Sequence, residues 1–196
     1  MRRSVALLAM ALLAPAGAEA VRSDLGPEDV GEALAHGKTV YERLRDQREA
    51  IDDVERGYLA DLGPEVGRAL LYTEFSTVAL EARRFAAIAR DPRPEDVEQM
   101  LGPLRGRLKF VVILVGSSRD FLRTYTARLV QGATTASPAR WDVYRSTPAP
   151  GTGRFQAPGE YVFHAKDVNL EAPVTLLLSD PQGREVRFDF DLSRLR

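Results

Sequence analysis

The sequence contains no cysteine. This absence excludes disulfide bonds, thiolate nucleophiles, cysteine-ligated metals and lipid attachment to an N-terminal cysteine. Histidine is scarce as well, since only His36 and His164 are present. A zinc site would therefore need carboxylates to complete its ligand set. We expect a fold held together by its hydrophobic core alone, with no catalytic residues, metal or cofactor.

A long apolar run is lacking after the first twenty residues, MRRSVALLAMALLAPAGAEA. This leader places two arginines ahead of an apolar stretch over residues 5–13 and ends in Ala18-Glu19-Ala20. The arrangement is typical of a signal peptide with an A-x-A cleavage site. The stretch is too short to cross a bilayer, which takes about 20 residues. We therefore expect export to the periplasm or beyond, cleavage after Ala20, and a mature chain without a transmembrane segment.

The charge balance has no excess of either sign. The chain has 27 basic and 28 acidic residues, and removal of the leader (two arginines and one glutamate) leaves 25 and 27, a net charge of −2. This balance gives no reason to expect nucleic acid as a partner. Lysine is rare, with three residues against 24 arginines (27 minus 3), which a coding bias explains. The mature chain of 176 residues (196 minus 20) is long enough for a substantial core.

Residues 27–104 have the patterns of helices. Pro27 and the carboxylates after it are typical of a helix start. A narrow apolar stripe follows, in which Gly37 and Arg48 occupy positions where an apolar residue is missing, so a break near His36-Gly37 is expected. The stretch 42–56 is charged and predicts a solvated face. The stripe consists of Val30, Leu34, Tyr41, Leu44 and Ile51.

The second part of this region is less regular. Residues 68–75 fit either a strand or an extended lead-in, and Ser76 or Thr77 is then positioned to cap a helix that ends near Arg90. A short helix from Pro94 to about Met100 follows. The expected apolar face of the first of these helices is Val78, Ala82, Phe85 and Ala89.

From residue 108 the period changes to two. Residues 174–178 and 186–190 alternate around Asp180-Pro181-Gln182-Gly183, which predicts a β-hairpin. Further strands are expected at 160–165 and 141–145, and Trp141, like Tyr41, is expected to pack in the core. With six or seven short strands between 108 and 192, the pattern predicts a small antiparallel sandwich.

The apolar run 108–115 ends at Gly116-Ser117-Ser118. We favour a hairpin turn over 116–120, because the residues after Phe121 alternate like a strand. In the alternative, Ser117 and Asp120 form a capping box and residues 119–130 are helical. Which of these holds is open at the level of sequence.

The same serines are the candidates for chemistry. A hydrolase using Ser117 or Ser118 would need His36 or His164 as its base. The second glycine of a nucleophile elbow is missing, and so are the second glycine and the lysine of a phosphate-binding loop. Oxygen ligands at Asp167, Asn169 and Glu171 are of the type that calcium takes, but the glycine and glutamate of an EF-hand are absent.

The segment PGEYVFHAKD resembles the Pro-Gly-x-Tyr-x-Phe segment of bacterial immunoglobulin-like modules. This resemblance implies that the hydroxyl of Tyr161 bonds back to the chain as a tyrosine corner. With LYTEFSTVALEARR and the ending FDFDLSRLR, most of the mature chain resembles uncharacterised exported proteins of high-GC bacteria. That family brings no activity with it. We expect an α+β protein with a signal peptide (1–20), a helical region (21–104) and a small antiparallel immunoglobulin-like β-sandwich (105–196).

The sequence therefore favours a non-enzymatic cell-envelope module with an interaction or structural role. The apolar stripe of the first helix would serve a protein partner in the envelope, or would complete the protein's own core. The alternatives are an envelope hydrolase using Ser117 or Ser118 with a histidine, and a protein that binds a sugar or other small ligand between the helical and β regions.

Overall fold

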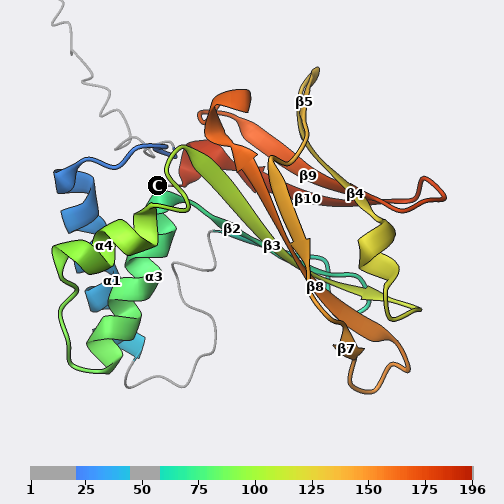
Figure 1. Ribbon diagram of the computed structural model, residues 1–196, viewed down its shortest axis with the longest axis horizontal. Coiled ribbons are helices and arrows are strands. Elements are labelled where there is room, and N and C mark those ends of the chain that lie inside the picture. The colour runs from blue at the N-terminus through green and yellow to red at the C-terminus, as the bar shows by residue number, and fades with distance from the viewer. Residues whose placement is uncertain (1–20, 45–57, 196) are drawn as a thin grey trace, which may run out of the picture.

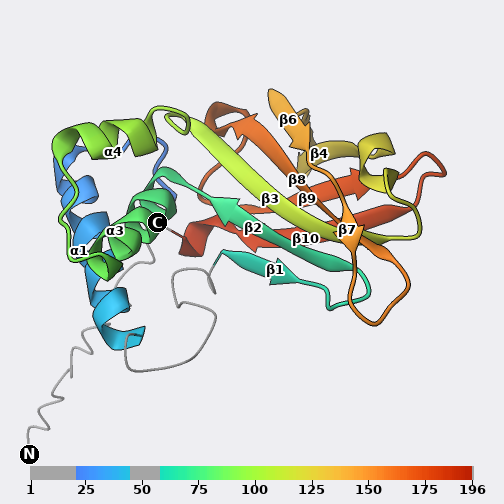
Figure 2. The ribbon, with the colours of Figure 1, turned by 60° about the horizontal axis from the view of Figure 1, so that its bottom comes forward.

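The computed structural model describes residues 21–44 and 58–195. The predicted leader, Arg48 and Ile51 lie outside the described residues. Within these described ranges, three α-helices gather at one end of two antiparallel β-sheets, which face each other as a sandwich (Figures 1 and 2). The predicted α+β class, with antiparallel sheets following N-terminal helices, is confirmed. No helix of the described segments has both the length and the apolar composition that a membrane crossing requires.

Helix α1 (Pro27–Leu44) begins at the predicted proline and runs through Gly37 without interruption. The expected break at His36-Gly37 is therefore wrong. The buried face of α1 is Ala33, Gly37 and Val40, at spacings of four and three. Gly37 takes the place of an apolar side chain because α3 lies against it at van der Waals distance. The glycine in the apolar stripe of α1 therefore indicates a close contact between α1 and α3.

Helices α3 (Glu74–Ala87) and α4 (Pro94–Leu101) follow. The cap of α3 is Thr73, not Ser76 or Thr77: the Thr73 hydroxyl accepts from the Ser76 N–H (3.1 Å), and the Ser76 hydroxyl accepts from the Thr73 N–H (2.9 Å). This capping box places Ser76 inside the helix. The helix starts earlier than predicted. The preceding strand ends at Tyr72, and the next residue, Thr73, is still extended and serves as the N-cap of α3.

The larger sheet has the strand order β1-β2-β3-β8-β6, and β7 also pairs with β8. Strands β1 and β2 come from the stretch expected to be helical, so the sheet begins before residue 105. Of the two readings of 68–75, the strand is the one observed. The bounds are β1 Leu59–Asp61, β2 Gly67–Tyr72, β3 Arg107–Gly116, β6 Arg140–Val143, β7 Thr147–Pro148 and β8 Phe155–His164.

The smaller sheet has the order β10-β9-β4-β5. Its strands are β4 Thr126–Gln131, β5 Thr134–Ala136, β9 Pro173–Ser179 and β10 Glu185–Asp191. The predicted hairpin is confirmed, since β9 and β10 pair with Leu176 opposite Phe188 and Leu178 opposite Val186. The Asp180 carboxylate organises its turn by accepting from the N–H groups of Gln182 and Arg184 (both 2.9 Å).

The segment after Gly116 is neither a hairpin turn nor the start of a long helix. One short 3-10 turn, Phe121–Thr124, leads into β4, and β4 belongs to the smaller sheet while β3 belongs to the larger. The expected hairpin turn at 116–120 and the alternative helix over 119–130 are therefore wrong, whereas the strand expected beyond Phe121 is present as β4. The chain crosses between sheets here because Leu122 is buried in the sandwich and the Phe121 ring covers Gly116. The alternation beyond Phe121 reflects pairing with β9.

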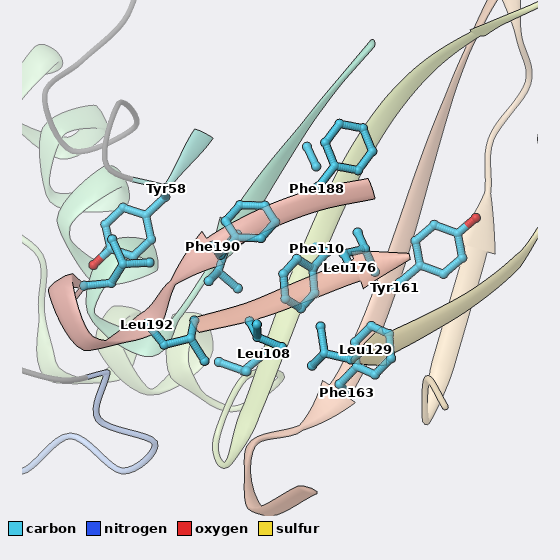
Figure 3. Close-up of a cluster of buried hydrophobic side chains, with 14 of the residues drawn as sticks. Tyr58, Leu108, Phe110, Leu129, Tyr161, Phe163, Leu176, Phe188, Phe190 and Leu192 are labelled. Carbon is cyan, nitrogen blue, oxygen red and sulfur yellow. The ribbon is translucent and has the colours of Figure 1, made fainter. Parts of the chain in front are cut away.

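The core lies between the sheets (Figure 3). Phe110 packs edge-on against Phe163 and Phe190, with ring centroids 5.6 and 5.3 Å away. Tyr161 is buried beside them, but its hydroxyl has no hydrogen-bond partner among the described residues, so the expected tyrosine corner is not formed. Trp141 was expected in the core and is instead 63% exposed, because β6 is an edge strand.

Candidate functional sites

The structure does not bring the candidate serines and histidines together. Ser117 and Ser118 are exposed beyond the last residue of β3. His164 pairs with Arg107 at the opposite end of β3, nine residues from Gly116, which is about 30 Å at the rise of an extended strand. His36 lies in α1 with its ring 6.0 Å from that of Phe75, at the helical end of the molecule. Neither histidine is therefore within reach of either serine.

The oxygen-rich segment 167–171 is tied to the fold by its own hydrogen bonds. The side-chain oxygen of Asn169 accepts from the Glu171 N–H (2.9 Å). Gln131 of β4 accepts from the Asn169 N–H (2.7 Å) and donates to the Asn169 carbonyl (2.8 Å). Across the described ranges, no three histidine, aspartate or glutamate side chains are grouped so as to hold a metal ion. The polar atoms of this segment have the geometry of a turn.

A groove of about 550 Å³ separates α1 from α4. Val30 and Leu34, one turn apart on α1, face Val97 and Leu101 of α4 across it. Val30, Leu34 and Val97 are only partly buried there. Val30 and Leu34 of the predicted stripe on α1 thus line the groove, whereas a neighbouring face of the helix contacts α3. Its other lining residues are Leu25, Pro27, Pro92, Pro94, Glu98 and Arg105.

The charges at the rim of this groove neutralise one another. Arg105 donates to both carboxylate oxygens of Glu98 (3.0 and 3.1 Å) and to Asp24 (3.3 Å). At the start of α4, the Asp96 carboxylate accepts from the backbone N–H of Arg93 (2.9 Å) and from the side chain of Arg90 (2.6 Å). The hydrogen bond from the Arg93 N–H is the main cause that lowers the pKa of Asp96, so this carboxyl stays ionised. The interior of the groove is left apolar.

A buried carboxylate holds the base of the groove in place. The Glu74 side chain, 1% exposed, accepts from the Leu25 N–H and the Gly106 N–H, each at 3.0 Å. It joins the segment before α1, the first turn of α3 and the loop before β3. Sequence reasoning did not identify Glu74, although a glutamate at the first position of a helix is a site where a carboxylate is stabilised.

A second groove, of about 410 Å³, lies between α3 and the outer face of the larger sheet. Lys109 and Tyr72 are opposite each other on β3 and β2, and the Lys109 ammonium lies 4.9 Å from the centre of the Tyr72 ring. Lys109 is half-buried, and no carboxylate pairs with it in the described part of the chain. On the helical side, Arg83, Arg84 and Glu81 line this groove, and Arg84 pairs with Glu81.

Comparison with known proteins gives little to add to this geometry. No family model matches the chain, and no curated protein matches it. Among solved structures, the chain is similar to the archaellum periplasmic stator protein FlaG from Sulfolobus acidocaldarius, with 14% identity and a TM-score of 0.29. The similarity covers 43% of this chain and 86% of FlaG. A likeness of this extent carries no argument about function.

Proposed function

We propose that the protein is a non-enzymatic module of the cell envelope, exported through residues 1–20, that binds a helical segment of a protein partner in the groove between α1 and α4. The observation that carries the proposal is the partial burial of Val30, Leu34 and Val97 around an apolar space of about 550 Å³. A partner side chain that fills this space removes the exposed part of all three from water, which is favourable in proportion to the area buried.

The walls of the groove favour a helix as the occupant. Both walls are α-helices, whose backbone groups are already bonded within α1 and α4, so an extended peptide would find no strand edge to pair with. A helix satisfies its own backbone and needs only an apolar face. The neutralised rim, with Glu98 and Arg105 paired, disfavours a strongly charged partner and is compatible with an amphipathic helix presenting aliphatic residues.

The proposal is tested by site-specific photocrosslinking in the native host. A photoreactive residue replaces Leu34 in the groove, and in a matched variant it replaces Thr39, which is exposed on the opposite side of the same helix. We expect one discrete protein adduct from position 34 that position 39 does not give. Val97→Lys should abolish that adduct while the melting temperature of the protein shows that it remains folded.

Two outcomes would overturn the proposal. The first is the absence of any adduct at position 34 in protein recovered from the envelope fraction. The second is an identical set of adducts from positions 34 and 39, since that result reports random collision. Recovery of the protein from the cytosol with its leader intact would contradict the proposed location.

The second groove favours a second candidate function, the binding of a small anionic ligand such as a sugar acid between the helices and the larger sheet. A half-buried ammonium that pairs with no carboxylate of the described residues favours an anion, and the Tyr72 ring beside it offers a flat apolar surface. Glucuronate should raise the melting temperature of the protein and glucose should not. Lys109→Met should remove the shift, whereas Lys166→Met, at an exposed site outside the groove, should keep it. Equal shifts in both variants would refute this candidate.

A further inference from the structure

Strand β6 is the last strand of the larger sheet, and in the described part of the chain it pairs only with β8. The Tyr144 N–H donates to the Pro158 carbonyl of β8 (3.0 Å). Because backbone groups alternate in direction along an antiparallel strand, Arg140 and Asp142 also direct theirs towards β8. Trp141, between them, directs its N–H and C=O to the open edge.

This edge carries exposed aromatic side chains. Trp141 is 63% exposed and Tyr144 is 50% exposed, three positions apart along the chain. Tryptophan, tyrosine and arginine are the residue types that most often dominate binding energy in protein interfaces. An open strand edge with such side chains is a surface that another strand can extend.

Edge strands are commonly protected from pairing by charged side chains, because charges of like sign on two edges repel each other. Here the two charges that flank Trp141 have opposite signs, and within the chain they pair with each other: Arg140 donates to the Asp142 carboxylate at 2.7 and 3.0 Å. In a two-fold antiparallel pairing centred on Trp141, residue 140 of one strand lies directly opposite residue 142 of the other. Each arginine would then face an aspartate, so the edge is complementary to itself.

We propose that the protein forms a two-fold homodimer in which β6 pairs antiparallel with β6 of a second copy, centred on Trp141. Trp141 exchanges two backbone hydrogen bonds with Trp141 of the second copy, and Arg140 faces Asp142 of the second copy. The two larger sheets become one continuous sheet, and both tryptophan side chains leave water.

The size of the contact sets its strength. A buried tryptophan contributes about 150–250 Å² of surface, whereas stable specific interfaces bury about 1,200–2,000 Å² in total. Two tryptophans supply about 300–500 Å² of surface, so even with a four-residue strand from each copy the contact falls below that range. The dimer is therefore a weak one whose population depends on concentration, and it does not hold the fold together.

The test is a charge-swap experiment read out by sedimentation equilibrium over a concentration series, on protein produced through its own leader. The mass of the unmodified protein should rise with concentration towards two-fold that of the monomer. Arg140→Asp places aspartate opposite aspartate, and Asp142→Arg places arginine opposite arginine, so each variant alone should stay monomeric. An equimolar mixture of the two variants should dimerise again, because every cross-strand pair in the heterodimer is complementary.

The mixture separates pairing between copies from any effect on one chain, since both variants have lost the intrachain Arg140–Asp142 pair. Arg123→Asp, which breaks an exposed ion pair with Asp120 outside β6, is the matched control and should dimerise like the unmodified protein. A protein that stays monomeric at every concentration would overturn the proposal. So would a mixture that remains monomeric while circular dichroism shows that both variants are folded. That result would favour a strand of a different protein as the partner of β6.

Discussion

The backbone of Gly37 in α1 lies directly against the carbonyl group of Ala79 in α3. A β-carbon at residue 37 would stand 2.0 Å from the Ala79 oxygen and 2.9 Å from the Ala82 β-carbon. The two helices approach this closely because small residues occupy both sides of the contact. Since α1 also forms one wall of the proposed partner groove, this contact sets the position of that wall.

Gly37→Ala should lower the free energy of unfolding by about 3 kcal/mol, at the upper end of the range for overpacked sites, because the new methyl group meets backbone atoms that cannot rotate away. Gly31→Ala is the matched control in the same helix, where a β-carbon meets no atom within 4 Å. It should raise the free energy of unfolding by about 0.5–1 kcal/mol through helix propensity. Urea denaturation measures both, and similar effects of the two substitutions would contradict the contact.

The Glu74 carboxylate should be worth more to stability than that of Glu81, the other glutamate of α3. Glu74→Ala leaves the Leu25 N–H buried without an acceptor and leaves the Gly106 N–H with the Ser23 carbonyl alone, so the free energy of unfolding should fall by about 1–3 kcal/mol. Glu81→Ala removes only an ion pair at the helix surface and should change it by about 0.5 kcal/mol or less. Hydrogen exchange of the Leu25 amide should accelerate in the first variant alone.

The ring of Phe121 explains why residue 116 is glycine. A β-carbon at residue 116 would lie 2.4 Å from Cγ of Phe121, so Gly116→Ala should lower the free energy of unfolding by about 1–3 kcal/mol. In a chain that already carries Phe121→Ala, the same substitution should cost almost nothing. A double-mutant cycle by chemical denaturation measures this coupling. Additive effects would show that the glycine is required for another reason.

Tyr161 should limit stability in alkali. Burial raises the pKa of its hydroxyl from 10.0 to about 12. The folded state therefore holds the proton at pH values where the unfolded chain has lost it, and the free energy of unfolding should fall as the pH rises from about 10 to about 12. Tyr161→Phe should remove this dependence, which urea titrations at several pH values would detect.

At neutral pH, Tyr161→Phe should raise the free energy of unfolding by about 1 kcal/mol, because it removes a buried hydroxyl that has no partner in the described structure. Tyr144→Phe, on the exposed edge strand, is the matched control and should leave stability within about 0.5 kcal/mol. A loss of stability in Tyr161→Phe would mean that the hydroxyl has a partner.

Local patterns predicted the elements whose determinants are close together in the chain. The start of α1 at Pro27 follows from the fixed backbone angle of proline, and the β9–β10 hairpin follows from two alternating runs around one turn. The candidate grooves were not predictable in this way. Val30 and Val97, or Tyr72 and Lys109, are brought together only by contacts between elements distant in the sequence.

Composition and local periodicity were sufficient to predict an α+β chain without cysteine chemistry, with helices at its start and antiparallel strands at its end. Three features became visible only in the folded chain: β3 and β4 lie in different sheets, Gly37 is a helix contact and not a break, and Trp141 is exposed at a sheet edge. The physical reason is that periodicity shows which face of an element is apolar. What covers that face depends on the packing of segments far apart in the chain.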